Sequence, residues 1–218
     1  MGECLLVFCY TKIGLHFAQT PRARSNGTGK VKIDVRIKMV TAEDVIEIYK
    51  KLSTNGIQVW LTGGWGIDAL LGRQTRPHKD LDVIMLLDDM VRMTELLSMN
   101  GYELDVLWSE NRMARDMNGN ETATAFVLKD AEEREFDAHA LTMDDQGNGM
   151  PAWDEAEDFI FKRADLEGLG TVAGFTVRCI TPESQIVCHS GYELPEKQLK
   201  DLDLLHEKFG VGYPGGLA

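Results

Sequence analysis

The chain has 218 residues, of which 44% are hydrophobic and 27% are charged. This balance is typical of a soluble globular protein with a sizeable core. The formal net charge of −12 argues against a nucleic-acid partner, because phosphate backbones recruit Lys and Arg. No stretch approaches the roughly 20 apolar residues that cross a membrane, and the four cysteines have no zinc-binding or CxxC spacing. We therefore expect a cytoplasmic protein without a nucleic-acid or membrane partner, and the sequence leaves a homodimer open.

Residues 1–38 differ in composition from the remainder of the chain. They carry seven basic and two acidic residues, a net charge of +5, whereas the whole chain carries −12. The segment from Thr20 to Lys30 is rich in Gly, Ser, Arg and Asn and offers almost nothing to bury, which is typical of disorder. We predict a disordered or dispensable extension, with a basic arm that touches a partner as the alternative.

Regular secondary structure is predicted from Thr41 onward. Thr41 and Asp44 form an N-terminal capping pattern, and apolar residues then follow at helical spacing as far as Asn55-Gly56. The next predicted elements are a strand over 57–61, which runs into a pair of glycines, and a short helix over 65–71.

The remaining elements indicate a mixed α/β protein. A strand is predicted over 80–86, and Asp88 is expected to cap a helix that ends near Gly101. Further strands are predicted over 102–108, 124–129, 134–141 and 176–180, with helices starting at Thr181-Pro182 and running through Leu199 to Phe209. Because strands and helices do not alternate strictly, we predict an α/β (α+β) fold, a mixed sheet flanked by helices.

Asp80 and Asp82 are the first candidates for chemistry. Side chains two apart on a strand point to the same face, and two adjacent carboxylates repel each other unless a cation lies between them. Mg²⁺ prefers oxygen ligands and keeps some of its coordination sites for substrate phosphates. The alternative is a pair of acids at a strand end that faces solvent.

The Gly63-Gly64 pair lies upstream of the two acids, at a strand-to-helix turn. Glycines let backbone N–H groups approach a triphosphate closely, and a helix N-terminus attracts anions. The intervening loop supplies Arg73, Arg76 and His78, cationic groups that could neutralise phosphate charge. Taken singly, each of these residues has an ordinary role in a turn or a solvated loop.

Asp137 is the candidate third carboxylate. It lies in the middle of a predicted strand whose alternate face is apolar, and such an acid is costly to bury unless it is paired or bound to metal. His139 shares its face by the period of two. Asp137 could be a metal ligand or a general base, and geometry has to decide between these roles.

Two segments resemble a known family. The run from Trp60 to Asp82, WLTGGWGIDALLGRQTRPHKDLD, is similar to antibiotic nucleotidyltransferases of the DNA polymerase beta superfamily. The run from Ile180 to Leu194, ITPESQIVCHSGYEL, resembles the small lincosamide nucleotidyltransferases in particular, as does Asn111-Arg112-Met113. The similarity extends from about Met39 to Leu205 and leaves residues 1–38 outside.

The resemblance implies a role for each matching position. Gly63 and Gly64 would cradle the triphosphate, Asp80 and Asp82 would bind two Mg²⁺ ions, and Asp137 would complete the metal site or act as base. The residues expected to bind the acceptor are Arg112, His139, His189 and Tyr192, although His189 and Tyr192 could equally have local packing roles. Two departures affect the acceptor side: Ala140 replaces the usual Pro, and the region 115–133 is longer than in the small lincosamide enzymes.

The resemblance further implies a polymerase-beta-like nucleotidyltransferase domain over 39–145 and a smaller C-terminal acceptor-binding or packing region over 146–218. The expected reaction transfers AMP from ATP, as the nucleoside triphosphate, to a hydroxyl group of an antibiotic. A lincosamide ranks ahead of an aminoglycoside as acceptor because of the His189 to Tyr192 segment. The alternative class is a non-catalytic, antitoxin-type relative that acts through a protein partner.

Overall fold

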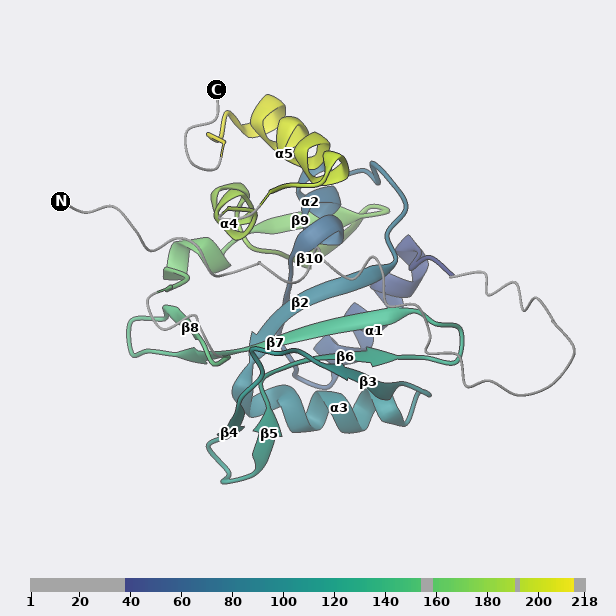
Figure 1. The fold of residues 1–218 in the computed structure, drawn as a ribbon, viewed down its shortest axis with the longest axis vertical. Helices are drawn as coiled ribbons and strands as arrows, with labels where there is room; N and C mark the ends of the chain where they lie inside the picture. The colour runs from purple at the N-terminus through teal and green to yellow at the C-terminus, as the bar shows by residue number, and fades with distance from the viewer. Residues whose placement is uncertain (1–37, 154–158, 191–192, 214–218) are drawn as a thin grey trace, which may run out of the picture.

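The computed structural model describes residues 38–153, 159–190 and 193–213 (Figure 1). The first helix, α1 (Ala42–Thr54), confirms the predicted capping signal. Thr41 Oγ1 accepts from Asp44 N at 3.2 Å, and Asp44 Oδ2 accepts from Thr41 N at 2.8 Å. The helix ends at Asn55, as predicted. Of the predicted extension 1–38, residues 1–37 lie outside the described residues.

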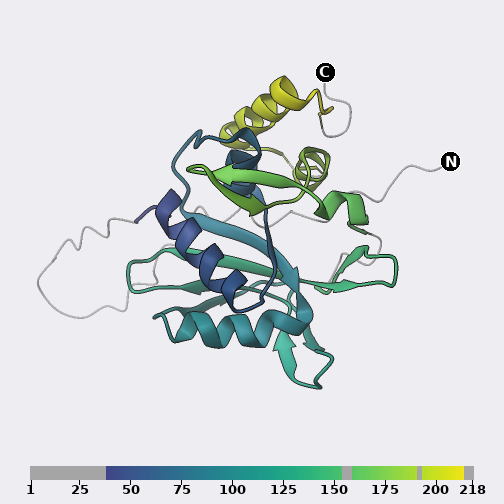
Figure 2. The same cartoon turned by 180° about the vertical axis from the view of Figure 1, so that it is seen from behind.

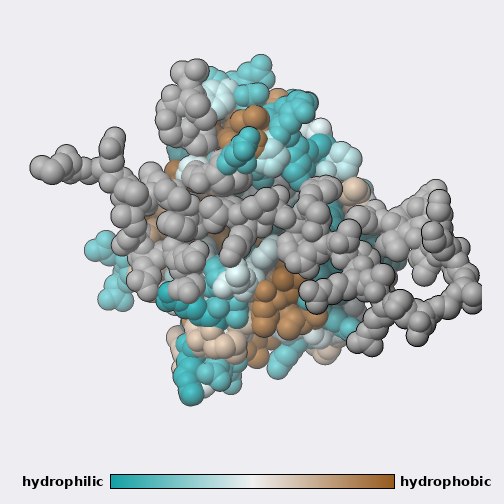
Figure 3. Space-filling view, in the orientation of Figure 1, coloured by the Kyte–Doolittle hydropathy of each residue, from teal (hydrophilic) through white to brown (hydrophobic). Residues whose placement is uncertain are grey.

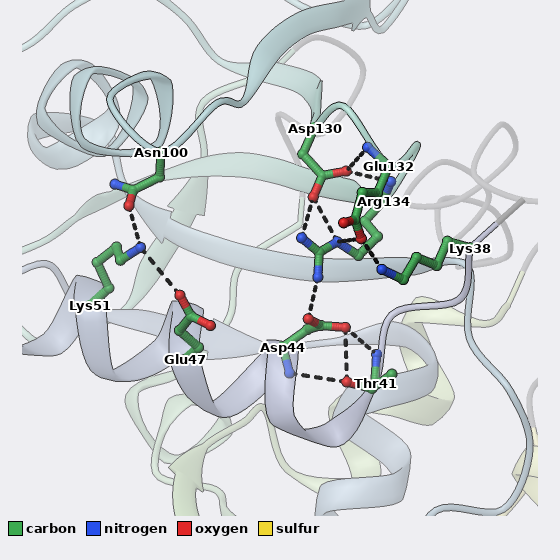
Figure 4. Close-up of polar contacts among 9 residues, drawn as sticks. All are labelled: Lys38, Thr41, Asp44, Glu47, Lys51, Asn100, Asp130, Glu132 and Arg134. Carbon is green, nitrogen blue, oxygen red and sulfur yellow. Dashed lines mark hydrogen bonds and ion pairs between the residues drawn. The ribbon is translucent and has the colours of Figure 1, made fainter.

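A polar network fastens the start of α1 to the turn between two strands of the sheet (Figure 4). Arg134 binds Asp44 of the capping box and also donates from Nε to Asp130 Oδ2 at 2.6 Å. Lys38 pairs with Glu132 in the same turn. The carboxylate that caps α1 is therefore also an anchor for the tertiary structure.

The large sheet is mixed, as predicted. Strand β2 pairs in parallel with β7, and the other neighbours are antiparallel. The strand order is β1 (Val59–Leu61), β2 (Asp80–Leu86), β7 (Glu135–Met143), β6 (Ala125–Lys129) and β3 (Glu103–Leu107), and β8 (Gly149–Pro151) pairs with β7. At the edge, Leu104 and Leu107 of β3 are 58% and 51% exposed, and apolar side chains gather over β3 and β6 in Figure 3.

The period of two divides strand β2 between two environments. Leu81, Val83 and Met85 belong to the main core, together with side chains of α1 and of α3 (Met90–Ser98). Ile84 belongs instead to a second apolar cluster with Trp60. Asp80 and Asp82 share the face of Ile84, because alternate residues of a strand lie on one side.

A smaller layer lies at the end of the molecule opposite to α3 (Figures 1 and 2). It consists of α2 (Gly63–Leu71), the hairpin β9 (Leu169–Val172) and β10 (Phe175–Arg178), α4 (Pro182–Cys188) and α5 (Glu196–Phe209). Lys208 Nζ of α5 donates to the carbonyls of Leu70 and Leu71 at 2.9 and 3.0 Å. These are carbonyls that the end of α2 leaves without helical partners, so α5 caps α2.

Some local predictions were wrong. Asp88 does not cap a helix: it lies in the 3-10 turn η1 (Leu87–Asp89), and its Oδ1 accepts from Met117 N at 2.7 Å. This hydrogen bond connects η1 to an additional hairpin formed by β4 (Met113–Arg115) and β5 (Glu121–Ala123). The strands β4, β5, β8 and β9 and the turn η2 (Arg163–Leu166) were not predicted. Within the described ranges, no helix is both long and apolar enough to span a bilayer.

Candidate nucleotide-binding and catalytic site

The register of two parallel strands brings the predicted carboxylates together. Asp82 of β2 lies opposite Asp137 of β7, and Asp80 lies opposite Glu135. Asp82 and Asp137 are only 8% and 4% exposed. Sequence spacing predicts that Asp80 and Asp82 share a face, and the strand pairing adds Asp137 to them.

Burial and mutual repulsion disfavour the charged forms of these carboxylates. Burial raises the pKa of Asp82 well above its ordinary value, and the charges of Asp80 and Asp137 raise it further. Burial is also the largest cause of the raised pKa of Asp80, followed by the charges of Asp137 and Glu135. Asp82 Oδ1 is buried and has no hydrogen-bond partner among the described residues. A cation at this place would relieve both the repulsion and the missing contact.

The predicted glycine pair opens α2 directly beside this carboxylate. Gly63 has φ +54°, a left-handed conformation that favours glycine, and a Cβ there would overlap Asp82 Oδ2. A Cβ at Gly64 would overlap His78 Nδ1. Helix α2 begins at Gly63, and the first backbone N–H groups of a helix have no partners within it. The two glycines therefore let the Asp82 carboxylate and the His78 ring lie directly against the start of α2.

Two of the three residues predicted to neutralise phosphate face this turn. Arg76 Nη2 lies 3.0 Å from the position of a Cβ on Gly64. Its guanidinium also donates to Asp201 of α5, from Nε at 3.0 Å and from Nη2 at 2.7 Å. Arg73, by contrast, is exposed and follows the C-terminal end of α2, away from Gly63. The structure therefore does not bring Arg73 to the turn.

His78 is buried between α2 and the turn. Its Nε2 is hydrogen-bonded to Asp68 Oδ2, and its ring packs against Trp65 with 5.0 Å between centroids. Nδ1 is buried and has no partner within the described part of the chain. Because Nδ1 is also the atom that a Cβ on Gly64 would meet, the open hydrogen-bonding position of the ring faces the glycine turn.

Asp137 is held by aromatic and basic neighbours. Trp108 Nε1 donates to Asp137 Oδ1 at 2.9 Å, and His139 Nδ1 lies 3.3 Å from the same oxygen. On its other side, His139 Nε2 lies 3.9 Å from Glu110 Oε1, and its ring meets Trp153 edge-on at 4.9 Å. One oxygen of Asp137 is thus already engaged. Over residues 38–153, 159–190 and 193–213, no group of three or more His, Cys, Asp and Glu side chains is already arranged to hold a metal ion.

Two carboxylates determine the charge of His139. Burial alone would lower the pKa of this histidine, but hydrogen bonds and charges from Asp137 and Glu110 raise it to about 10. Conversely, burial would raise the pKa of Glu110, but its hydrogen bonds, first that with His139, lower it. A histidinium between two carboxylates is therefore the expected state near neutral pH.

Of the other residues predicted to bind the acceptor, Arg112 and His189 lie on different elements. Arg112 precedes β4, and its backbone N–H donates to Thr124 Oγ1 at 2.9 Å. His189 is buried at the end of α4, where its Nδ1 donates to Gln185 O at 2.7 Å, and burial lowers its pKa. Strand β4 and helix α4 are well separated along the long axis of the molecule (Figure 1), so Arg112 is not adjacent to His189. Tyr192 lies outside the described residues.

Three carboxylates of the site were missed in the sequence. Asp68 gave a usable signal, because it is a single acid in the apolar stretch of α2, and a buried acid requires partners. Glu110 and Asp201 gave none, since each meets its partner only through the tertiary fold.

Comparisons with known proteins agree with this geometry. The family model described as aminoglycoside-2″-adenylyltransferase matches residues 44–205. A lincosamide resistance protein of Staphylococcus haemolyticus is 28% identical over 163 residues, which are 75% of this chain and 92% of that protein. The structure of the lincosamide antibiotic adenylyltransferase LnuA with lincomycin bound is 26% identical, with a TM-score of 0.64, over 77% of this chain and 98% of that one. The structure of ANT(2″)-Ia with adenylyl-2″-tobramycin is 21% identical, with a TM-score of 0.55, over 78% of this chain and 89% of that one, and it shows likeness of fold.

The mixed sheet and its helices form a nucleotidyltransferase fold. More specifically, this chain belongs to the aminoglycoside-2″-adenylyltransferase family, whose model covers most of its length.

Proposed function

We propose that this protein transfers AMP from ATP to a hydroxyl group of a lincosamide antibiotic and thereby confers resistance. The observation that carries the proposal is the Gly63-Gly64 turn set directly against Asp82, whose strand neighbour is Asp137. A triphosphate on the turn and an acceptor hydroxyl near Asp137 would meet beside Asp82.

The choice of acceptor is supported by the relatives. The lincosamide resistance protein and LnuA are 28% and 26% identical to this chain, which covers 92% and 98% of their lengths. The likeness to ANT(2″)-Ia, at 21% identity, supports the fold but adds nothing on the acceptor. An aminoglycoside remains the second candidate, favoured by the description of the matching family.

The carboxylates fit a magnesium site. Asp82 Oδ1 is buried without a partner among the described residues, and the pKa of Asp82 is raised by burial and by its acidic neighbours. We assign Asp80 and Asp82 as the ligands of two Mg²⁺ ions, with Asp137 as a further candidate ligand. Bound Mg²⁺ would neutralise these carboxylates and the negative charge that develops on the phosphates.

The chain's own groups would align and deprotonate the acceptor. The hydroxyl oxygen attacks the α-phosphorus in line, the new P–O bond forms, the bond to the β-phosphate oxygen breaks, and pyrophosphate leaves. In its alternative role as general base, Asp137 would take the hydroxyl proton on Oδ2, because Trp108 and His139 already engage Oδ1. The helix N-terminus of α2 and Arg76 would stabilise phosphate charge.

A comparison of two drug classes tests the acceptor assignment. Purified protein is assayed with ATP and Mg²⁺ against lincomycin and against tobramycin, and kcat/KM is measured from pyrophosphate release. We expect a clear preference for lincomycin, with one AMP added per drug molecule by mass spectrometry. Preference for tobramycin would reverse the ranking, and turnover of neither drug would remove the antibiotic assignment. An Asp82→Asn sample serves as the matched negative control.

A further inference from the structure

We propose that Asp68 is a positioning residue of the nucleotide site, which holds the loop 73–79 against the glycine turn at the start of α2. The inference rests on the proposed function, since it assumes that a nucleoside triphosphate binds at this turn. It adds a residue that does not touch the nucleotide but fixes the groups that do.

Both oxygens of Asp68 are committed to the loop. Oδ1 accepts from the backbone N–H of Thr75 at 3.1 Å and from its hydroxyl at 2.5 Å. Oδ2 is hydrogen-bonded to His78 Nε2. The backbone carbonyl of Asp68 also accepts from Arg73 N at 3.2 Å. A single residue in the middle of α2 therefore fixes the loop at its beginning, its middle and its end.

The contact with His78 decides which ring atom is left for a ligand. With Nε2 engaged by Asp68, only Nδ1 can make another hydrogen bond, and it is buried without a partner within the described residues. This atom faces Gly64, where a Cβ would overlap it. An N–H at this position would donate to a phosphate oxygen that lies over the turn.

The contact with Thr75 determines the path of the chain immediately before Arg76. The Arg76 guanidinium reaches the same turn, 3.0 Å from the position of a Cβ on Gly64, while it also binds Asp201. If the backbone at Thr75 moved, the guanidinium would have to leave either Asp201 or the turn. Asp68 thus positions Arg76 as well as His78.

Joining a loop to a helix through a buried carboxylate costs free energy. Asp68 is 2% exposed, and burial of an acid is tolerated only when its hydrogen bonds are satisfied. Hydrogen bonds to a carboxylate are shorter and stronger than those between neutral groups. We therefore expect its removal to affect nucleotide binding more than folding.

The test compares Asp68→Asn with Thr75→Val and with a matched control, Asp116→Asn. Asp116 is also buried, and its side chain accepts from the backbone N–H groups of Asn118 at 2.9 Å and Asn120 at 2.8 Å, in the β4–β5 hairpin. Binding of the Mg²⁺ complex of α,β-methylene-ATP to the full chain is measured by calorimetry. KM values for ATP and for lincomycin are measured separately.

We expect Asp68→Asn to weaken nucleotide binding by about tenfold and to raise KM for ATP, with KM for lincomycin unchanged. Thr75→Val removes one of the three bonds and should show a smaller loss of the same kind, which keeps the test decisive if Asp68→Asn fails to fold. Asp116→Asn should bind nucleotide like the wild type. If Asp68→Asn and Thr75→Val bind the nucleotide as tightly as the wild type does, the role assigned to Asp68 is wrong, and the proposed function is not affected. Absence of nucleotide binding by the wild type would overturn the proposed function with it.

Discussion

Asp82 Oδ1 lies buried without a hydrogen-bond partner among the described residues, and burial, Asp80 and Asp137 all raise the pKa of its carboxyl group. The proposed chemistry needs Asp82 in its charged form, and the fold disfavours this form when no cation is bound. Function and stability make opposite demands on this side chain.

Replacing Asp82 by Asn separates these demands. We expect Asp82→Asn to lower turnover by orders of magnitude and to raise the free energy of unfolding without Mg²⁺ by about 1 to 3 kcal/mol, because asparagine has no carboxyl group whose charged form is disfavoured in the fold. Thermal unfolding with and without Mg²⁺ measures the second effect, and the variant should lose the stabilisation by Mg²⁺ that the wild type shows. Asp145→Asn, at an exposed position, is the control that should change neither property. Near-normal turnover by Asp82→Asn would contradict the assignment.

His139 gives the stability of the protein a dependence on pH. Its pKa is raised to about 10 in the folded protein, against 6.5 as the ordinary value. The folded state therefore holds a proton that the unfolded chain has released, so the stabilisation is complete below 6.5 and is lost as pH rises through 10. The raised pKa values of Asp80 and Asp82 act in the same direction without Mg²⁺.

We expect the free energy of unfolding to fall between pH 7 and pH 9 by up to about 1.4 kcal/mol per pH unit from His139 alone. Denaturant titrations at several pH values without Mg²⁺ measure this slope, and the difference from His139→Gln isolates the part that His139 contributes. His139→Gln should flatten it. The range stops at pH 9 because burial raises the pKa of the Cys179 thiol to about 12, which adds a slope of its own above that pH. An unchanged slope in His139→Gln would show that other groups cause it.

Among the elements, the start of α2 depends on a backbone conformation and on a close approach. Gly63→Ala introduces a side chain at φ +54° and places its Cβ on Asp82 Oδ2. Gly101→Ala has the same kind of strain, at φ +85°, but nothing lies within 4 Å of its Cβ. We expect both variants to lose about 1 to 2 kcal/mol of stability from the positive φ, and only Gly63→Ala to lose nucleotide binding. Loss of binding in both variants would attribute the effect to general destabilisation.

The sequence predicted those elements whose signals are local. The capping pair at Thr41 predicts the start of α1, and the predicted strand over 80–86 has the same bounds as β2. The predicted helix over 65–71 begins two residues earlier, at Gly63, because Gly66 N donates to Thr62 O and closes a helical turn where glycines alone indicate a loop. Asp88 was misassigned since its partner, Met117, belongs to a hairpin of short strands that have no pattern of their own.

In the candidate site, too, the residues that could be predicted are those with a local signal in the sequence. Asp80, Asp82 and the glycine pair lie within one short segment, so their spacing is informative. Asp137 could be placed on its strand but not beside Asp82, because strand pairing is a tertiary property. Glu110 and Asp201 could not be assigned at all, since each acts through a partner on a distant element.

For the whole molecule, residues 1–37 are predicted to be dispensable for the domain. Their Gly-rich, basic composition offers little to bury, and α1 already has a complete capping box. We expect a protein that starts at Lys38 to keep its melting temperature within about 2 °C, a shift that corresponds to less than 1 kcal/mol, and to keep kcat/KM for both substrates. Thermal unfolding and pyrophosphate release measure these quantities, and a large fall in melting temperature would show that the segment packs on the domain.

The parallel pairing of β2 with β7 also governs how such a protein can diversify. Asp82 and Asp137 are strand neighbours although 55 positions separate them along the chain. The chain between them leaves the site, forms α3 and the β4–β5 hairpin, and returns. Because the entropy of closing such an excursion grows only slowly with its length, residues can be added or lost at its hairpin without shifting the carboxylates. The surface of the excursion can therefore evolve as a module, while the reaction centre that it connects stays constant.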